Sequence, residues 1–239
     1  MEISSNGDQI LSVDIGGSNI KATLLNCEGE MLMDYQKLPT PDPASPSSVI
    51  NIIQELSKSC GDYNKVSVGF PGYVRQGIIH TAPNLNTALW KDVDLSKQLS
   101  DVLGKPVRIL NDADMLGLGV IKGKGFEMVI TLGTGFGTAF VKDGKLLPHL
   151  ELGQHPVSKD RTYDQYVGEA AFVSKGLEKW NERMQKVIDI LKTTFNYDQL
   201  YIGGGNAKKL SFQLEENMIL FSNRDGIRGG ARLWHNEMD

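Results

Sequence analysis

An asparagine–aspartate pair, Asn111-Asp112, follows an apolar strand predicted over residues 107–110. An alcohol is a poor nucleophile, and a carboxylate beside it can take the hydroxyl proton while the oxygen attacks a phosphorus atom. Asp112 is therefore a candidate general base. Aspartate also caps helices, and a helix is predicted over residues 115–122. Either Asp112 or Asp114 can cap it, with Asp114 preferred, so the sequence by itself leaves both roles open for Asp112.

Two glycine-rich strings resemble loops that offer backbone amides to phosphate oxygens. They run from Asp14 to Lys21 and from Leu132 to Thr138, and each is predicted to form a strand, a turn and a second strand. The candidate phosphate-binding residues are Gly16, Gly17, Ser18, Lys21, Gly133, Thr134 and Gly135. Asp14, at a strand end, is a candidate for holding Mg²⁺ through water. A plain hairpin would explain either string taken alone.

Neither string matches the common nucleotide-binding loops. No Gly-Lys-Ser/Thr follows the first at the spacing of a Walker loop, and a strand rather than a helix follows the second. A third cluster, Gly203-Gly204-Gly205, lies between a predicted strand and a predicted helix over 206–211. Its flat backbone is a candidate surface for adenine or ribose, and a tight turn is the alternative.

The segment Glu151-Leu152-Gly153-Gln154-His155 places a carboxylate, an amide and an imidazole close together. Sugar hydroxyls both donate and accept hydrogen bonds, so groups of these kinds suit them. A polar loop is the alternative interpretation. No second His or Cys lies at metal-ligand spacing, which argues against a metal site here.

The elements expected to position these residues are short strands and amphipathic helices. In the first half the pattern predicts strands over 10–15, 20–26, 31–38, 65–70 and 107–110, and helices over 47–60 and 95–103. In the second half it predicts helices over 115–122, 163–194, 206–211 and 226–234, strands over 128–132, 138–142 and 199–202 and near Leu220, and a hairpin turn at Asp143-Gly144. Both halves begin with a strand, a glycine-rich turn and a strand, which predicts two related lobes.

The composition excludes several classes of protein. The chain has 239 residues, 40% of them hydrophobic, and a net charge of -4, so neither nucleic acid nor an anionic membrane is the expected partner. No apolar run is long enough to span a bilayer, and residues 1–9 lack the apolar segment of a signal peptide. Cys27 and Cys60 are far apart in the sequence, which favours reduced thiols and a cytoplasmic location.

Taken together and in this order, the motifs resemble the ROK family of sugar kinases and regulators, in particular its polyphosphate-using glucokinases. The resemblance extends from Leu11 to about Trp234, and its further strings are Gly69-Phe70-Pro71-Gly72, Thr81-Ala82-Pro83-Asn84-Leu85-Asn86 and Asn111-Asp112-Ala113-Asp114. It implies an α/β fold of the two-lobed actin–hexokinase–Hsp70 (ribonuclease H-like) ATPase type, with a nucleotide cleft between the lobes. We expect one lobe over residues 1–112 plus 224–239 and the other over 113–223.

The resemblance also implies roles for individual residues. Asp112 becomes the general base, Asn111 and Glu151 become sugar ligands, and Gly72 and Asn84 line the sugar pocket. The turns at Gly16–Ser18 and Gly133–Gly135 hold phosphates, and Lys21 matches a lysine of the polyphosphate-using branch. Further candidates for binding polyphosphate are Lys122, Lys124, Lys142 and Lys145.

Three departures from the family pattern bear on the sugar site. The cysteine-rich zinc segment of many members is absent, so no zinc is expected. The family histidine would fall at Gln154, whereas this chain has His155 one position later, and either side chain is a candidate. A family glutamate aligns with Asp164, which is one methylene shorter.

These observations predict a hexose kinase that uses Mg²⁺ and transfers a phosphoryl group from ATP or polyphosphate to the 6-hydroxyl of glucose. The resemblance to the family also implies a homodimer. The alternatives are a sugar sensor with weak kinase activity, a kinase for an N-acylated aminosugar, a sugar-responsive DNA-binding regulator and a chaperone-like or cytoskeletal ATPase. Neither the sugar nor the donor is fixed by the sequence.

Overall fold

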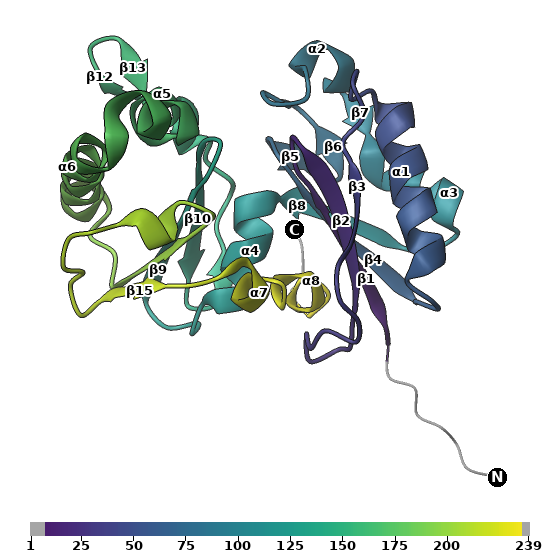
Figure 1. Cartoon of the computed structure of the whole chain (residues 1–239). Coiled ribbons are helices and arrows are strands. Elements are labelled where there is room, and N and C mark those ends of the chain that lie inside the picture. Colours follow the sequence, from purple (N-terminus) through teal and green to yellow (C-terminus); the bar gives the residue numbers. More distant parts are fainter. Residues whose placement is uncertain (1–7, 236–239) are drawn as a thin grey trace. The chain divides into compact units, whose positions relative to one another are not determined.

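The computed structural model describes residues 8–235 (Figure 1). The chain divides into two compact units, called here unit 1 (Met1–Gly119 with Ile227–Asp239) and unit 2 (Val120–Gly226). These boundaries lie a few residues beyond those expected at 112 and 223. The reason is that helix α4 (Asp112–Val120) packs within unit 1, where Arg232 donates from Nη1 to the Leu118 carbonyl at 2.7 Å.

The sheet of unit 1 has the strand order β3-β2-β1-β4-β8. Its strands are β1 (Ile10–Ile15), β2 (Asn19–Leu25), β3 (Gln36–Pro39), β4 (Lys65–Phe70) and β8 (Val107–Asn111). β1, β2 and β3 form an antiparallel meander, whereas β1, β4 and β8 are parallel. The carboxyl ends of the three parallel strands therefore share one edge with the β1–β2 turn.

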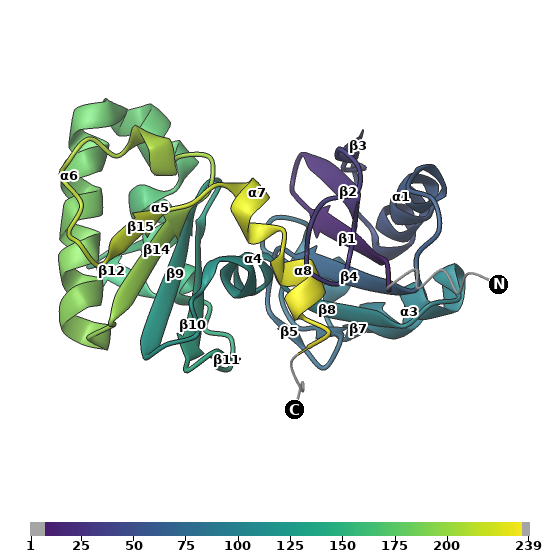
Figure 2. The same ribbon diagram turned by 90° about the horizontal axis from the view of Figure 1, so that it is seen from below.

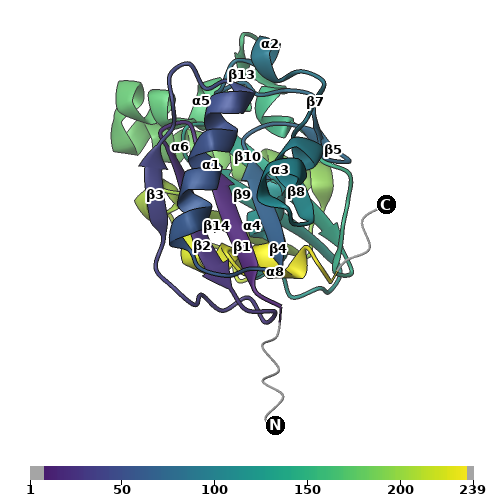
Figure 3. The same ribbon diagram turned by 90° about the vertical axis from the view of Figure 1, so that its right-hand side faces the viewer.

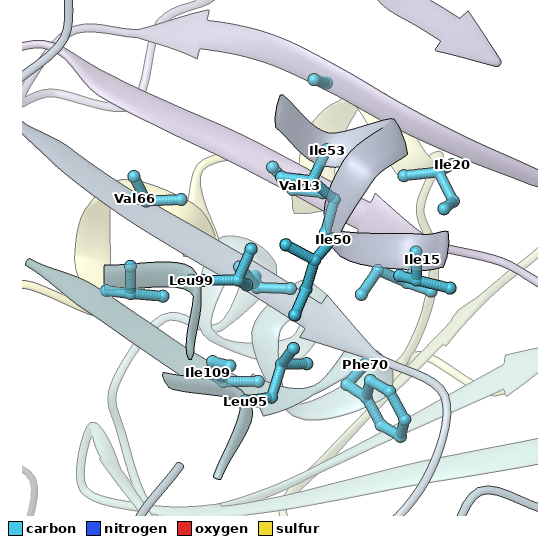
Figure 4. Close-up of a cluster of buried hydrophobic side chains, with 14 of the residues drawn as sticks. Val13, Ile15, Ile20, Ile50, Ile53, Val66, Phe70, Leu95, Leu99 and Ile109 are labelled. Carbon is cyan, nitrogen blue, oxygen red and sulfur yellow. The ribbon is translucent and has the colours of Figure 1, made fainter. Parts of the chain in front are cut away.

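Two helices, α1 (Pro46–Ser59) and α3 (Leu95–Leu103), cover one face of this sheet (Figure 3). Figure 4 shows the core between these helices and the sheet, where strand residues such as Val13 and Val66 pack against Ile53 of α1 and Leu99 of α3. Each of these four side chains is fully buried, and burying such a side chain contributes roughly 1.5–3 kcal/mol relative to leaving it exposed. The alternating apolar residues of β1 thus fix which face carries the core and leave Ser12 and Asp14 on the other.

The sheet of unit 2 repeats the plan of unit 1, with the order β11-β10-β9-β14-β15. Its strands are β9 (Phe126–Leu132), β10 (Phe136–Lys142), β11 (Lys145–Leu146), β14 (Gln199–Gly203) and β15 (Met218–Leu220). β9 and β10 are antiparallel, and β9, β14 and β15 are parallel. Asp143 and Gly144 both have positive φ, which confirms the predicted hairpin turn. The related strand orders confirm the predicted internal repeat.

The long helix of unit 2, α6 (Glu169–Phe195), runs along one face of the sheet (Figure 2). The single helix predicted over 163–194 is wrong, because α5 (Tyr163–Val167) ends at Gly168 before α6 begins. A Cβ at Gly168 would lie 2.5 Å from the Asp164 carbonyl oxygen, so the break needs glycine. Gly176, with φ 76°, breaks the helical geometry within α6.

Three other predicted elements differ from the structure. The strand expected over 31–38 is reduced to β3 and one bridge between Leu25 and Met31, because Asn26 and Glu30 close a turn through paired hydrogen bonds. The final helix expected over 226–234 is two short helices, α7 (Asn223–Gly226) and α8 (Gly229–Arg232). The helix expected over 206–211 is one 3-10 turn, η2 (Ala207–Lys209).

Short ribbons and turns complete both units. In unit 1 these are β5 (Val74–Arg75), β6 (Ile78–Ile79), β7 (Val93–Asp94) and α2 (Thr87–Trp90). In unit 2 they are η1 (Leu152–Gln154), β12 (Pro156–Ser158) and β13 (Arg161–Thr162).

A buried carboxylate organises the start of unit 2. Glu127 is 1% exposed and accepts hydrogen bonds from the backbone amides of Lys122, Gly123 and Lys124 and from the Tyr201 hydroxyl. Burying a carboxylate is costly unless its oxygens are hydrogen-bonded. These four donors offset that cost and hold the 122–124 segment against β9.

Candidate active site

The β1–β2 turn of unit 1 is held by hydrogen bonds to its carbonyls. The Gly16 amide donates to the Asn19 carbonyl at 3.0 Å, and Thr40 donates to the carbonyls of Gly16 and Ser18. These bonds use the carbonyls of the turn, while Gly17 and Ser18 are exposed. Asp14 and Lys21 face each other across the strands, with Lys21 Nζ 3.4 Å from Asp14 Oδ2. The predicted phosphate-binding residues of unit 1 thus lie together beside a carboxylate.

Asp112 lies on the same sheet face as Asp14. Gly69 of β4 is in register with Asp14 of β1, so any side chain at 69 would point to the same face. A Cβ at Gly69 would lie 3.7 Å from Asp112 Cβ and 2.9 Å from Met115 Cε. Glycine at 69 therefore lets the first turn of α4 approach the sheet, and Asp112 lies against β4, the strand that pairs with the one carrying Asp14.

Asn111, rather than the expected Asp114, caps α4. Asn111 Oδ1 accepts from the amides of Ala113 at 2.8 Å and Asp114 at 3.4 Å. Its Nδ2 donates to the Gly72 carbonyl at 3.1 Å. Asp114 is buried within the first helical turn, so the prediction of Asp114 as the cap is wrong. Asn111 connects the start of α4 to the 70–72 turn.

The other two predicted sugar-pocket residues of unit 1 lie in the loops beside this edge. Gly72 is buried, and a Cβ there would lie 2.1 Å from the Thr81 carbonyl oxygen. Asn84 is exposed, and its Cβ is 4.0 Å from the position that a Cβ on Gly17 would take. The structure thus brings Asn84 to the β1–β2 turn and Gly72 to Asn111.

In unit 2 the turn Gly133–Gly135 is fixed by the start of α6. The Gly133 amide donates to the Gly135 carbonyl at 3.2 Å, and the Glu169 amide donates to the Gly133 carbonyl at 2.9 Å. As in unit 1, the protein uses the carbonyls of the turn, and Thr134 is exposed. Amides at such a turn can bind phosphate oxygens.

Asp164 connects this turn to the 151–155 segment. Its Oδ1 accepts from the Phe136 amide at 2.6 Å, and its Oδ2 accepts from Gln154 Nε2 at 2.7 Å. A Cβ on Gly135 or on Gly153 would lie 2.8 or 2.6 Å from Asp164 Oδ1. The carboxylate is therefore packed between the turn Gly133–Gly135 and the segment predicted to bind sugar.

Gln154 and His155 have different contacts in the structure. Gln154 reaches Asp164, whereas the His155 ring lies 6.4 Å from the Tyr163 ring, centroid to centroid, and the His155 carbonyl accepts from the Tyr163 amide. Both side chains are exposed. Of the two candidates, Gln154 is the one whose side chain is hydrogen-bonded to Asp164.

The remaining carboxylate, Glu151, has a partner that the sequence analysis missed. His149 Nε2 lies 3.1 Å from Glu151 Oε1, and the His149 side chain is only 6% exposed. The spacing of His149 and Glu151 in the sequence could have indicated this pair, because residues i and i+2 of an extended segment point to the same side. His149 holds the Glu151 carboxylate in place.

Acidity should affect stability through Asp164. Burial raises the pKa of Asp164, the Glu151 charge adds to this, and the bonds from the Phe136 amide and Gln154 oppose it. A raised folded-state pKa gives a contribution to stability that is complete below the unfolded value, about 3.9, and is lost as pH rises through the folded value. We therefore expect the unfolding free energy of the wild type, relative to Asp164→Asn, to fall as pH rises from about 4.

Urea unfolding of both proteins across this pH range measures that difference. Asp160→Asn, at an exposed position in the β12–β13 turn, is the matched control and should show no such trend. An unfolding free energy of the wild type that instead increased with pH relative to Asp164→Asn would contradict the assigned direction of the shift.

The third glycine cluster offers less open backbone than its sequence suggests. A Cβ on Gly203 would lie 2.2 Å from Phe221 Cζ, so the Phe221 ring covers that glycine. Gly204 has φ 88°, and a Cβ there would lie 2.3 Å from the Leu132 carbonyl oxygen. Only Gly205 has no atom within 4 Å of the built Cβ. The tight turn accounts for Gly203 and Gly204, which leaves Gly205 as the open position.

The lysines proposed for polyphosphate in unit 2 lie away from the turn Gly133–Gly135, which is predicted to bind phosphate. They are near the start of β9 and the end of β10, where Gly123 faces Gly144 and Lys142 pairs with Asp143 at 3.3 Å. The turn Gly133–Gly135 lies at the opposite end of these strands, about 20 Å away at 3.3 Å per residue. Lys122, Lys124, Lys142 and Lys145 are therefore not beside that turn.

Among residues 8–235, no group of three or more His, Cys, Asp or Glu side chains is arranged to hold a metal ion. Mg²⁺ in phosphoryl-transfer sites is usually held by one or two carboxylates together with substrate phosphates, and Asp14 beside the β1–β2 turn fits that donor set. No helix in the described part of the chain is long and apolar enough to cross a membrane.

Comparison with known proteins identifies relatives of the whole fold. The polyphosphate/ATP-glucomannokinase of Arthrobacter sp. strain KM has a TM-score of 0.86 at 29% identity, covering 95% of this chain and 98% of that one. A ROK family glucokinase of Streptomyces griseus, solved with glucose and AMPPNP, has a TM-score of 0.74 at 18% identity, covering 94% and 98%. The predicted fold class, the α/β fold of the actin–hexokinase type, is confirmed.

Relatives found by sequence similarity are also sugar kinases. The polyphosphate glucokinase of Mycobacterium leprae is 33% identical over 82% of this chain, and the match spans 63% of that protein, just under two thirds of its length. That of Mycobacterium tuberculosis is 30% identical over 82% of this chain and 77% of its own. The names of these relatives agree with the predicted phosphotransferase class. The sequence model of the ROK family matches residues 10–153. The chain belongs to the ROK family.

Proposed function

We propose that the protein is a hexose kinase that transfers a phosphoryl group to the 6-hydroxyl of glucose. The observation that carries this proposal is the position of Asp112, at the first turn of α4 beside Gly69, on the sheet face that also carries Asp14. A carboxylate at this edge is suited to deprotonate an alcohol next to a phosphate-binding turn. The sugar kinases among the relatives support the same assignment.

In unit 1, Asp112 accepts the proton of the 6-hydroxyl while the sugar oxygen attacks the donor phosphorus and the bond to the leaving phosphate breaks. Asn111, the 72 turn and Asn84 position the sugar, and the amides of Gly17 and Ser18 bind phosphate oxygens. The Asn111–Gly72 hydrogen bond supports this assignment because it holds the two elements in a fixed arrangement. Catalysis then rests on positioning and charge stabilisation, as is usual for phosphoryl transfer.

In unit 2, Glu151 and Gln154 bind sugar hydroxyls, and the turn Gly133–Gly135 binds donor phosphate. His149 orients the Glu151 carboxylate. Bound Mg²⁺ would neutralise charge on the donor phosphates. Asp14 would hold it through water, and Lys21, 3.4 Å from Asp14, would supply a further positive charge to the phosphates.

Polyphosphate is the donor that we propose first, with ATP as the second. Two features support this order. The similar proteins include polyphosphate glucokinases and a polyphosphate/ATP-glucomannokinase. In addition, Phe221 and the Leu132 backbone cover two of the three glycines expected to face an adenosine group. A donor without a base has no need of that surface.

The test combines the purified protein and Mg²⁺ with glucose, mannose, fructose, N-acetylglucosamine or N-acetylmannosamine and with either donor. Sugar phosphate is measured by mass spectrometry, and kcat/KM is determined for each pair. We expect glucose 6-phosphate, with a higher kcat/KM for polyphosphate than for ATP. A higher kcat/KM for ATP would reverse the donor order, and no product with any pair would overturn the proposed function.

A further inference from the structure

The hydrogen bond between Gln154 and Asp164 fixes the orientation of the Gln154 amide. A glutamine side chain carries a donor, the NH₂ group, and an acceptor, the carbonyl oxygen. An ionised carboxylate only accepts, so the partner of Asp164 Oδ2, 2.7 Å away, is the Gln154 Nε2 donor. Gln154 Oε1 then remains as an acceptor for another molecule, beside the second N–H of Nε2, on a side chain that is exposed.

Asp164 itself has little freedom to change partners. Its Oδ1 accepts from the Phe136 amide at 2.6 Å, and the bare Cα atoms of Gly135 and Gly153 leave just enough room for its carboxylate. Gly153 lies next to Gln154 in the chain, so the contact that holds the carboxylate also holds the segment carrying the amide. The backbone of Gly135–Phe136 and that of Gly153 thus hold the Asp164–Gln154 pair in position.

We infer that Asp164 is a positioning residue that orients the Gln154 amide, so that Gln154 Oε1 accepts a hydrogen bond from one sugar hydroxyl and selects hexoses able to donate at that position. This inference rests on the proposed function. It assigns Asp164 a different role from the direct sugar contact expected from the sequence, because both carboxylate oxygens already have protein donors. Asp164 is a specificity-determining residue that acts through Gln154.

Asp164→Asn should reverse the amide of Gln154. The Phe136 amide still needs an acceptor, so the substituted side chain would place its oxygen there and direct its NH₂ group at Gln154. Gln154 would then turn its oxygen toward that NH₂ group and leave its own NH₂ group for the sugar. A site that needs a donating hydroxyl would become one that prefers an acceptor. The change is nearly isosteric and removes a partly buried charge, so the fold should tolerate it.

Deoxyfluoro sugars measure this reversal, because fluorine at a sugar carbon can accept weakly but cannot donate. We would measure Kd by calorimetry and kcat/KM for glucose and its 1-, 2-, 3- and 4-deoxyfluoro analogues. At one position the wild type should bind the fluoro analogue about tenfold or more weaker than glucose, since its acceptor loses a partner. Asp164→Asn should reduce that ratio to within about threefold and leave the other positions unchanged.

Asp160→Asn is the matched control and should keep the wild-type pattern. Gln154→Ala should abolish the discrimination at the same position. A folded Asp164→Asn protein with the wild-type ratios at every position would overturn the inference. If Asp164→Asn does not fold, Asp164→Glu, which keeps two acceptor oxygens, must retain the discrimination that Gln154→Ala loses, and any other result for this pair overturns it.

The calorimetric arm separates this inference from the proposed function. A wild type that binds the sugars with the expected pattern, and loses that pattern in Asp164→Asn, but makes no sugar phosphate would support the orientation of Gln154 and overturn the kinase. A wild type that makes glucose 6-phosphate with no position-dependent effect of fluorine would support the kinase and overturn the orientation.

Discussion

Asp112→Asn should lower kcat for glucose phosphorylation about 100-fold or more and change the Kd for glucose by less than about threefold. Asp112 Oδ1 accepts from the Ala113 amide at 2.8 Å, and asparagine can make the same bond with its own oxygen. The start of α4 should therefore remain intact. What the substitution removes is the ability to take the hydroxyl proton.

Steady-state kinetics and calorimetry on the same preparation separate the two effects. Asp62→Asn, at an exposed position in unit 1, is the matched control and should keep the wild-type kcat. If Asp112→Asn retained kcat within about threefold of the wild type, another group would have to be the base.

Gly72→Ala should reduce both stability and sugar affinity. A Cβ at this position would lie 2.1 Å from the Thr81 carbonyl oxygen and 3.2 Å from Ala82 Cα, so backbone has to move. Crowding of this kind costs about 1–3 kcal/mol, which lowers the melting temperature by roughly 3–10 °C. The Gly72 carbonyl also accepts from Asn111 Nδ2, so the displaced turn should weaken glucose binding on the order of tenfold.

Thermal melting checks the expected loss of stability, and calorimetric titration with glucose checks the expected loss of affinity. Gly205→Ala serves as the comparison for stability, because no atom lies within 4 Å of a Cβ built there. It should melt within about 2 °C of the wild type, since an uncrowded substitution usually changes stability by less than about 0.5 kcal/mol. Equal melting temperatures for Gly72→Ala and Gly205→Ala would show that the 72 turn is not tightly packed.

The parts of the fold that the sequence predicted well are those with local signals. β1 and β4 were placed at their observed ends because apolar residues are bounded there by glycine and polar residues. α3 was also placed correctly, since its apolar spacing is regular and Gly104 ends it in a left-handed conformation. The two glycine-rich turns, between β1 and β2 and between β9 and β10, were placed correctly because glycines between strands are a signal from neighbours in the chain, and their binding of phosphate stays a prediction.

The parts that failed depend on contacts distant in the sequence. α4 begins at Asp112 and not at 115, because Gly69 on another strand leaves room for that turn. The Phe221 ring that covers Gly203 comes from the end of another strand, and no local pattern indicates it.

The candidate sugar site shows the same limit. Gln154 and His155 were equal candidates in sequence, and only the folded position of Asp164 distinguishes them. Residues of similar chemistry in adjacent positions cannot be separated until a partner from another element is known. The role of each side chain at the site remains a prediction that the substitutions above test.

The most direct measurement of the central claim is donor consumption with and without glucose, followed by phosphorus NMR in the presence of Mg²⁺. A kinase should consume polyphosphate or ATP only when glucose is present and should form one hexose phosphate per phosphoryl group lost, with the phosphorus coupled to the two protons on C6. Donor loss at the same rate without sugar, yielding free phosphate, would contradict the account and identify the protein as a phosphohydrolase.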